Sequence, residues 1–331
     1  MSQSRVRIAV LGDGGWGTTL AMHLHRLGHR VTWWGAFPDQ VREVARHREN
    51  VKFLPGIPIP RQLPITSDLS KAVESARLIV LAIPSQYLRS VVRRVPGSGT
   101  RAFLSVAKGL ETTTLKRMSE VVREELGSVG VAVLSGPNIA SEIARGQPAI
   151  SVVASTNASL ATEIQRVFTS DRFRVYTSRD VVGVELSGAL KNPMAIAAGI
   201  ADGLGFSANA KAALVARGVV EMARLGVAMG AREKTFYGLS GLGDLITTCL
   251  GGRNRGLGEQ IGRGKSLSTI LAQSPMVIEG VATTKAAVAL ARRHRIELPI
   301  IEQVHAVLFR RKAPSRALQS LMRRTRKAEF A

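Results

Sequence analysis

A glycine loop near the N-terminus places the strongest constraint on how this 331-residue chain can fold. Gly12, Gly14 and Gly17 have the spacing G-x-G-x-x-G, and they lie between an apolar run at 6–11 and an amphipathic stretch at 18–27. In a strand–turn–helix unit the first glycine allows a tight turn, the second lets a phosphate approach the backbone, and the third lets the helix pack on the strand. Free N–H groups at the start of the helix attract phosphates. The loop therefore predicts a dinucleotide-binding domain.

The sequence after the loop alternates short apolar runs with amphipathic stretches, which is typical of a parallel sheet covered by helices. Gly28 and Gly127 stand where left-handed C-terminal caps are expected. A proline-rich segment at 53–60 is unsuited to a helix or a central strand. The predicted strands are 6–11, 31–34, 78–83, 102–106, 131–134 and 150–154, and the predicted helices are 18–27, 40–47, 86–93, 115–126 and 160–168.

The strand pattern stops at about residue 180. Apolar residues then recur at spacings of three and four, which indicates helices, and the tail residues Ala317, Leu318, Leu321 and Met322 fit one helical face that packs on the domain. The predicted helices are 181–199, 208–230, 267–271, 283–294 and 301–309. We expect an α/β protein with an N-terminal Rossmann-type doubly wound sheet, residues 1–182, followed by an all-α C-terminal domain, residues 183–331.

The chain is strongly basic, with a formal net charge of +22. Such a charge raises nucleic acid, anionic membrane and anionic metabolites as partners. The basic residues are dispersed along most of the chain, with a dense run between Arg310 and Lys327, and only 5% of residues are aromatic. Since no zinc-ligand spacing or aromatic platform accompanies the charge, we expect a solvated basic surface, no specific nucleic-acid partner and no metal.

Cysteine content and hydropathy predict the compartment. Cys249 is the only cysteine and has no partner for an intrachain disulfide. No apolar run approaches the roughly 20 residues of a transmembrane helix. The N-terminal residues pass into the glycine loop without a signal-peptide cleavage site. We therefore expect a cytoplasmic protein with no transmembrane segment.

The residues that would choose between NAD and NADP are missing from their usual position. The second strand ends in Trp33-Trp34-Gly35-Ala36, which offers neither an acid for a ribose 2′-hydroxyl nor an arginine for a 2′-phosphate. The choice between the two cofactors stays open at this point.

Polar residues in apolar surroundings mark a candidate site beyond the glycine loop. Lys108 and Asn138 follow the carboxyl ends of predicted strands, where doubly wound sheets bind ligands. Lys191 lies in an apolar helical stretch, where an unpaired ammonium is costly to bury. A structural ion pair with Glu185 or Asp244, or a lysine that reaches the surface, explains Lys191 equally well on the residues alone.

A set of collinear motifs covers nearly the whole chain. In order they are Gly12-x-Gly14-x-Trp16-Gly17-Thr18-x-Leu20-Ala21, Leu54-Pro55-Gly56-Ile57, Ala82-Ile83-Pro84-Ser85, Ala107-Lys108-Gly109-Leu110-Glu111, Leu134-Ser135-Gly136-Pro137, Val184-Glu185-Leu186-Ser187-Gly188-Ala189-Leu190-Lys191-Asn192, Asp202-Gly203-Leu204-Gly205, Gly238-Leu239-Ser240-Gly241-Leu242-Gly243-Asp244-Leu245, Arg253-Asn254-Arg255 and Glu279-Gly280-Val281. Together they resemble the bacterial NAD(P)-dependent glycerol-3-phosphate dehydrogenases.

The resemblance implies an oxidoreductase that reversibly reduces the phosphorylated triose dihydroxyacetone phosphate to sn-glycerol 3-phosphate, a precursor of glycerophospholipids, with NAD or NADP. It implies that Lys191 is the catalytic acid/base, assisted by Lys108 and Asp244. The implied substrate positions are Lys108, Gly136, Asn138, Lys191, Asp244, Gly252, Arg253 and Asn254. The cofactor positions are Gly12, Gly14, Gly15, Trp16, Gly17, Lys108, Ala140, Arg253, Val277 and Glu279. We also expect a homodimer.

The residue types suit that chemistry. Hydride addition to a ketone leaves negative charge on its oxygen, so a cation that can also give up a proton should stand beside that oxygen. Burial and neighbouring cations such as Lys108 and Arg253 are expected to lower the pKa of Lys191, while Asp244 orients its ammonium. The planar guanidinium of Arg253 suits the substrate phosphate, and Asn254 can bond a hydroxyl or phosphate oxygen.

The chain departs from the family pattern at four positions. Gly15 replaces a common serine, and Ala36 replaces a basic residue, which puts a 2′-phosphate contact in doubt. Gly252 replaces another serine in a loop about two residues shorter, a change that alters reach more than stability. Pro193, if it lies within a helix, removes one backbone bond and could re-aim Lys191.

Two alternative functions remain on the sequence alone. One is a dehydrogenase of the same architecture acting on another phosphorylated or carboxylated ketone. The other is a cofactor-binding protein that has lost catalysis and whose basic surface serves nucleic acid or anionic membrane.

Overall fold

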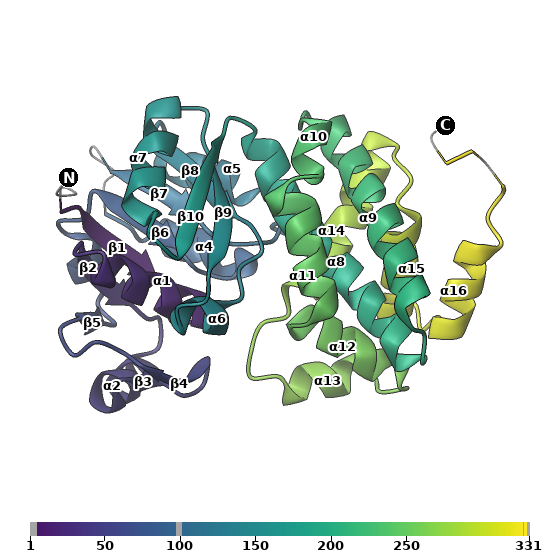
Figure 1. Ribbon diagram of the computed structural model, residues 1–331, viewed down its shortest axis with the longest axis horizontal. Coiled ribbons are helices and arrows are strands. Elements are labelled where there is room, and N and C mark those ends of the chain that lie inside the picture. Colours follow the sequence, from purple (N-terminus) through teal and green to yellow (C-terminus); the bar gives the residue numbers. More distant parts are fainter. Residues whose placement is uncertain (1–4, 97–100, 327, 330–331) are drawn as a thin grey trace.

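The computed structural model describes residues 5–96, 101–326 and 328–329. Figure 1 shows two parts side by side: a sheet covered by helices, which holds the N-terminus, and a group of helices, which holds the C-terminus. The sheet has eight strands in the order β10-β9-β8-β7-β6-β1-β2-β5, parallel throughout except between β8 and β9. The strands are β1 (Arg7–Leu11), β2 (Arg30–Trp34), β5 (Ile65–Thr66), β6 (Leu78–Leu81), β7 (Ala102–Ser105), β8 (Gly130–Ser135), β9 (Ala149–Ala154) and β10 (Phe173–Ser178).

Strand periodicity explains why both faces of the sheet are covered. In β1, Ile8 and Val10 join one apolar cluster, and the alternate residues Ala9 and Leu11 join a second cluster on the opposite face. The first cluster contains α1 and α7, and the second contains α3, α4 and α5. The helices of this part are α1 (Gly15–Arg26), α2 (Pro38–His47), α3 (Leu69–Val73), α4 (Ser85–Val92), α5 (Met118–Leu126), α6 (Ala140–Ala144) and α7 (Ala158–Phe168). The predicted doubly wound sheet is confirmed.

Several short or exposed elements of this part were not predicted, and in the helical part neither were the helices between residues 233 and 262. Those of this part are β5, β10, α3 and α6, and a ribbon of β3 (Glu49–Asn50) and β4 (Leu54–Pro58). The proline-rich segment is indeed neither helix nor central strand, because it forms β4 of that separate antiparallel ribbon. In β10, exposed Arg174 and Tyr176 alternate with buried Phe173 and Val175, so this edge strand lacks the continuous apolar run that marks the inner strands.

The two predicted glycine caps have different outcomes. Gly28 follows α1 with φ +86°, as a left-handed cap requires. The prediction for Gly127 is wrong in its geometry, because φ 73° and ψ −144° put this residue in a region that only glycine adopts readily, outside the left-handed helical one. The chain leaves α5 there in extended form and enters β8.

The second part contains a central helix with neighbours around it. They are α8 (Val181–Gly203), α9 (Ala208–Ala228), α10 (Glu233–Phe236), the π-helical turn η1 (Leu239–Gly243), α11 (Asp244–Leu250), α12 (Arg253–Gly262), α13 (Leu267–Gln273), α14 (Glu279–His294), α15 (Pro299–Phe309) and α16 (Pro314–Met322). Most of α8 is buried. A Cβ on Gly199 would lie 1.9 Å from the Arg255 carbonyl oxygen, and one on Gly258 would lie 2.1 Å from the Ile196 carbonyl oxygen. These glycines let α8 and α12 pack backbone to backbone, which fixes the start of α12.

The basic tail begins as a helix at the edge of the molecule (Figure 1). Ala317 is buried, and Leu318 and Leu321 are partly buried, as predicted. Met322, however, is 78% exposed at the last position of α16, so the predicted packing is wrong for this residue. Lys327, the last residue of the basic run, lies outside the described residues.

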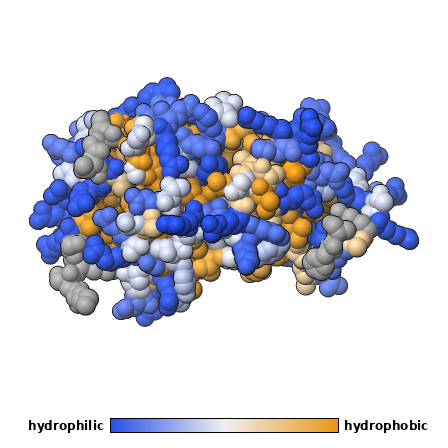
Figure 2. All heavy atoms as spheres, turned by 90° about the horizontal axis from the view of Figure 1, so that it is seen from above, coloured by the Kyte–Doolittle hydropathy of each residue, from blue (hydrophilic) through white to orange (hydrophobic). Residues whose placement is uncertain are grey.

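On the face seen in Figure 2, hydrophilic side chains cover most of both parts, with hydrophobic side chains visible between them. Among the described residues, none of the helices has the length and apolar character needed to cross a membrane.

One buried carboxylate should matter to the stability of the helical part. Glu221 of α9 accepts hydrogen bonds from the N–H groups of Ile300 and Ile301, each at 2.9 Å, at the start of α15. Glu221→Ala leaves both buried donors without a partner, so we expect urea unfolding to show a loss of about 2–3 kcal/mol. Glu221→Gln keeps one acceptor oxygen and should lose less. Glu302→Ala is the control: it removes an exposed acid of the same helix end that accepts a single long bond, 3.5 Å from the Leu298 N–H, and it should lose less. A Glu221→Ala protein as stable as the parent would contradict this role.

Candidate active site

The glycine loop has the shape of a phosphate cradle. Gly12 has φ +127°, and a Cβ there would lie 2.3 Å from the Ala82 carbonyl oxygen. A Cβ on Gly17 would lie 2.1 Å from the Gly12 carbonyl oxygen, whereas one on Gly14 would meet nothing within 4 Å. The outer glycines are therefore required by packing, and the middle one leaves open space at the N-terminus of α1, which begins at Gly15. The residues present fit a dinucleotide.

Ala140 lies beside this loop, as its predicted role requires. The Thr19 hydroxyl of α1 donates to the Ala140 carbonyl oxygen at 3.0 Å, and a Cβ on Gly15 would lie 3.8 Å from the Ala140 Cβ. Trp16, next to Gly15, is partly buried against the apolar cluster of α1. The start of α6 and the start of α1 thus face each other across the cradle.

Three of the predicted residues meet in one buried cluster. Asp244, at the start of α11, accepts from Lys191 of α8 on Oδ1 at 2.8 Å and from Lys108 on Oδ2 at 2.6 Å. Lys108, which follows β7, also donates to the Gly136 carbonyl oxygen at 2.8 Å. Lys191 makes a further bond of 2.5 Å to the Thr248 hydroxyl. The Asp244 side chain is 2% exposed and that of Lys191 is 8% exposed, so both ion pairs are shielded from water.

The environment of Lys191 lowers its pKa to about 8. Burial is the main cause, because it disfavours the charged ammonium, and the Lys108 ammonium acts in the same direction. Asp244 opposes both by attracting the charge. Arg253 was also expected to contribute, but it is not among the groups that shift this pKa; its guanidinium donates to the Val277 carbonyl oxygen at 3.0 Å.

The structure decides which acid pairs with Lys191. Glu185 lies six residues earlier in α8 and accepts from Arg117 at 2.6 Å and from the Ser119 hydroxyl at 2.5 Å. Asp244 is therefore the partner. Pro193 lies within α8, and the helix continues past it to Gly203 while Lys191 still reaches Asp244.

Hydrogen bonds between side-chain amides connect Asn254, a predicted substrate residue, to the lysine cluster of Lys108, Lys191 and Asp244. The Nδ2 of Asn254 donates to Asn192 Oδ1 at 2.9 Å, and its Oδ1 accepts from the Gly280 N–H at 2.9 Å. Asn192 in turn donates to the Lys108 carbonyl oxygen at 2.8 Å. Asn254 thus helps to hold the segment that carries Lys108. Gly252, with φ +98°, is the N-cap residue of α12, immediately before Arg253.

Glu279, a predicted cofactor residue, bridges the two parts of the molecule. Its carboxylate accepts from the Ser85 N–H at 2.8 Å and from the Ser85 hydroxyl at 2.5 Å. A Cβ on Gly109 would lie 2.4 Å from the Ser85 hydroxyl oxygen and 2.6 Å from a Glu279 carboxylate oxygen. Gly109, next to Lys108, is therefore needed for this close contact.

Asn138 makes its side-chain hydrogen bonds to β9. Its Oδ1 accepts from the Ser151 hydroxyl at 2.8 Å, and its Nδ2 donates to the Ile150 carbonyl oxygen at 3.3 Å, both on β9. Two residues before Asn138, the Gly136 carbonyl oxygen accepts the hydrogen bond from Lys108.

Thr248 contacts Lys191 in the buried cluster and was not predicted from the sequence. It lies four residues after Asp244 in α11, so both side chains share one helix face. This spacing was the only signal that could have identified it.

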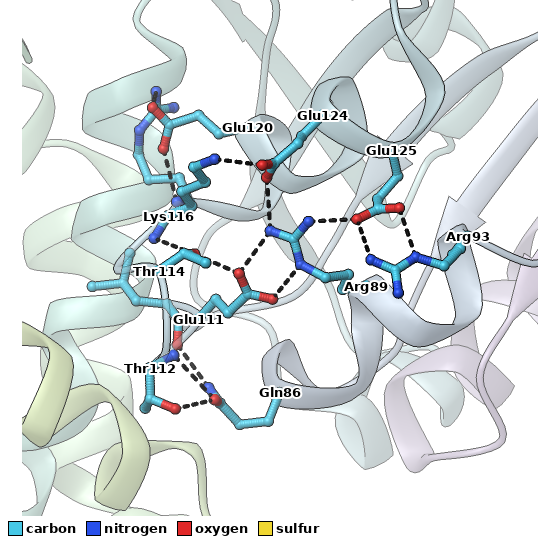
Figure 3. Close-up of polar contacts among 12 residues, drawn as sticks. Gln86, Arg89, Arg93, Glu111, Thr112, Thr114, Lys116, Glu120, Glu124 and Glu125 are labelled. Carbon is cyan, nitrogen blue, oxygen red and sulfur yellow. Dashed lines mark hydrogen bonds and ion pairs between the residues drawn. The ribbon is translucent and has the colours of Figure 1, made fainter.

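An ion-pair network supports the segment that follows Lys108 (Figure 3). The Arg89 guanidinium of α4 binds both carboxylate oxygens of Glu111 at 2.8 Å, and it also contacts Glu124 and Glu125 of α5. The Gln86 amide donates to the Leu110 carbonyl oxygen at 2.7 Å. These contacts anchor residues 110 and 111, and so limit the motion of Lys108 nearby. Within residues 5–96, 101–326 and 328–329, no group of three or more His, Cys, Asp or Glu side chains could hold a metal ion.

Comparison with known proteins agrees with this arrangement. A family model described as the N-terminus of NAD-dependent glycerol-3-phosphate dehydrogenase matches residues 7–161, and the model of its C-terminus matches residues 180–319. The chain is 47% identical over 329 residues to the glycerol-3-phosphate dehydrogenase [NAD(P)+] of Thermoanaerobacter sp. (strain X514), covering 98% of this chain and 99% of that protein. It is 48% identical over 331 residues to the protein of the same name from Pelotomaculum thermopropionicum, covering 98% and 95%.

Solved structures give the same result. The crystal structure of glycerol-3-phosphate dehydrogenase from Coxiella burnetii superimposes with a TM-score of 0.93 at 38% identity, covering 97% of this chain and 99% of that one. Since both halves of the chain match in sequence and in fold, this chain belongs to the NAD-dependent glycerol-3-phosphate dehydrogenase family of oxidoreductases, which use NAD or NADP.

Proposed function

We propose that Lys191 is the general acid and base of the reaction, the reversible reduction of dihydroxyacetone phosphate to sn-glycerol 3-phosphate. The observation that carries the proposal is the buried Lys191 ammonium, paired with Asp244 and having a pKa of about 8. A group whose pKa lies near the working pH can both hold and release a proton at useful rates. Its positive charge also stabilises the oxyanion that forms as the ketone is reduced.

The neighbouring residues have distinct parts in this proposal. Asp244 orients the Lys191 ammonium and keeps it charged, since its carboxylate lies 2.8 Å away. Lys108 contacts both substrate and cofactor in this proposal. Its ammonium also pairs with Asp244, and it follows the carboxyl end of β7, the edge of the sheet where the cofactor binds. The remaining substrate contacts are assigned to Gly136, Asn138, Gly252, Arg253 and Asn254. Arg253 is exposed at the start of α12, where a phosphate can reach it.

The cofactor positions in the proposal divide between the two parts of the chain. Gly12, Gly14, Gly15, Trp16 and Gly17 hold the pyrophosphate at the start of α1, with Ala140 beside them. Val277 and Glu279 form the opposite side of the cofactor site, on the helical part. Glu279 accepts a hydrogen bond from Ser85, which lies in the other part of the chain. When bound, the nicotinamide supplies or receives the hydride. This division corresponds to a cofactor-binding domain at 1–182 and a substrate-binding, catalytic domain at 183–331.

The pH dependence of the rate tests the role of Lys191. Reduction needs the protonated lysine, so with a pKa of about 8 its rate should be flat below that pH and fall above it, while oxidation should rise through the same range. Absorbance loss of NADH and NADPH is followed with and without dihydroxyacetone phosphate across this range. No turnover with either nucleotide would overturn the function. A rate that does not change with pH near 8 would show that Lys191 takes no part in the proton transfer.

We also propose that the enzyme acts in the cytoplasm, where it supplies sn-glycerol 3-phosphate for phospholipid synthesis. The single, buried Cys249 supports a compartment without disulfides. The homodimer stays a prediction, which sedimentation of the purified protein measures.

A further inference from the structure

The carboxylate of Asp13, a residue of the glycine loop, lies at the end of β2, where the ribose of the cofactor is expected. In the parallel pair of β1 and β2, Leu11 lies opposite Trp34, so the chain leaves both strands side by side. The Gly12 N–H donates to the Trp34 carbonyl oxygen at 2.9 Å, and Trp33 Nε1 donates to the Gly12 carbonyl oxygen at 2.8 Å. Asp13 follows directly, and it is therefore held beside the end of β2.

Asp13 lies in the space into which a side chain at position 35 would project. A Cβ on Gly35 would lie 2.6 Å from Val41 Cγ2, 2.9 Å from Asp13 Oδ2 and 3.0 Å from Asp13 Cβ, so Asp13 shares this space with Val41. Position 35, the first residue after β2, is where Rossmann-type domains carry the acid that binds the ribose 2′-hydroxyl. The carboxylate missing from the end of β2 is thus replaced by one from the glycine loop.

The surroundings of Asp13 indicate a group without a full set of partners. Asp13 Oδ2 is buried and has no hydrogen-bond partner among the described residues. An unpaired buried carboxylate oxygen is costly, so its presence requires an explanation. Burial also raises the Asp13 pKa, opposed by the backbone N–H groups of Asp13 and Ala36 and by the charge of Lys52. Because this oxygen is out of contact with solvent, a ligand hydroxyl relieves the cost only when the carboxylate turns toward it.

We propose that Asp13 makes the enzyme selective for NAD(H) over NADP(H). Its carboxylate favours a ribose 2′-hydroxyl, which can donate a hydrogen bond, and repels a 2′-phosphate, which carries about two negative charges and has no proton to share. Ala36, the neighbouring residue, offers no positive charge to offset that repulsion. This inference rests on the proposed position of the cofactor at the glycine loop.

Lys52 is the cation that could act in the opposite direction. It is exposed, its ammonium lies 5.1 Å from the centre of the Phe53 ring, and its charge acts on Asp13. If Lys52 held a 2′-phosphate, the enzyme would prefer NADPH. The affinities of the two nucleotides decide between Asp13 and Lys52.

Calorimetric titration with NADH and NADPH in the absence of substrate tests the proposal. The wild-type protein should bind NADH about tenfold or more tightly than NADPH, and Asp13→Asn should reduce this ratio by about tenfold, mainly by strengthening NADPH binding. Asp171→Asn, which makes the same change at an exposed carboxylate in the turn before β10, is the control and should leave the ratio unchanged. Lys52→Gln should also leave the preference for NADH in place.

The outcomes are separable from those of the reaction. A wild-type preference for NADPH that Lys52→Gln abolishes, or an equal ratio in Asp13→Asn and wild type, would overturn the assignment. So would a failure of both nucleotides to bind. If Asp13→Asn shifts the ratio of NADH to NADPH affinity while the wild-type protein does not turn over dihydroxyacetone phosphate, the role of Asp13 stands and only the reaction is overturned.

Thermal unfolding of the cofactor-free proteins gives a second measurement. Asp13→Asn removes a poorly paired buried charge, so its Tm should equal or exceed that of the wild type. A clear drop in Tm together with an unchanged nucleotide ratio would show that the carboxylate is purely structural.

Discussion

Lys191→Ala is expected to lower kcat for the reduction of dihydroxyacetone phosphate by about 10²- to 10⁴-fold, the usual contribution of a positioned acid. The fold should survive the change, because Asp244 keeps its second partner, the Lys108 ammonium at 2.6 Å, and is not left as an unpaired buried charge. Binding of NADH, measured by calorimetry, should change little, since the glycine loop lies in the other part of the chain. Steady-state rates at saturating substrate measure the loss.

Two further variants sharpen this test. Lys191→Met fills most of the same space but has no charge and no proton to transfer. A similar loss of kcat in this variant would exclude a cavity as the cause. Lys211→Met removes a lysine that pairs with Asp202 at 2.8 Å in the same helical part, and it should keep its rate. A Lys191→Ala enzyme with the rate of the parent would remove Lys191 from the chemistry.

The elements that the sequence predicted well are those whose signals are local. The glycine loop shows itself by the spacing of three glycines within six residues. The inner strands β1, β6 and β7 are mostly apolar, because helices cover both of their faces. The missed edge strands β5 and β10 are short or half exposed, so neither length nor apolarity marks them. For the same reason the short helix α6 was not found, although it carries Ala140.

The candidate site was less accessible to sequence reasoning, because its contacts join distant segments. The sequence and the family resemblance named Lys108, Lys191 and Asp244, but only the fold shows that one carboxylate serves both lysines. The role of Asp13 depends on the register of β1 and β2, which places it against Gly35. Nothing near Asp13 in the sequence indicates that contact.

Asp244→Asn is expected to shift the pH dependence of reduction as well as to lower its rate. In the wild type, Asp244 opposes the burial and the Lys108 charge that bring the pKa of Lys191 down to about 8. Without that carboxylate the pKa should fall further. Since reduction needs the protonated lysine, the descending limb of its pH profile should move to lower pH by the same amount. Rates measured from acid to alkaline pH locate this limb.

The same substitution should destabilise the protein, because it leaves two ammonium groups close together without a counter-charge. We expect a loss of about 3 kcal/mol in the free energy of unfolding where both lysines are charged. A lysine whose pKa is lowered in the folded state destabilises that state when it is protonated, so the loss should shrink as pH rises. Asp202→Asn is the matched control, because Asp202 also joins two cations, Lys211 and Arg255, outside the lysine cluster. Asp244 would have no part in setting the charge of Lys191 if Asp244→Asn kept the wild-type limb and rate.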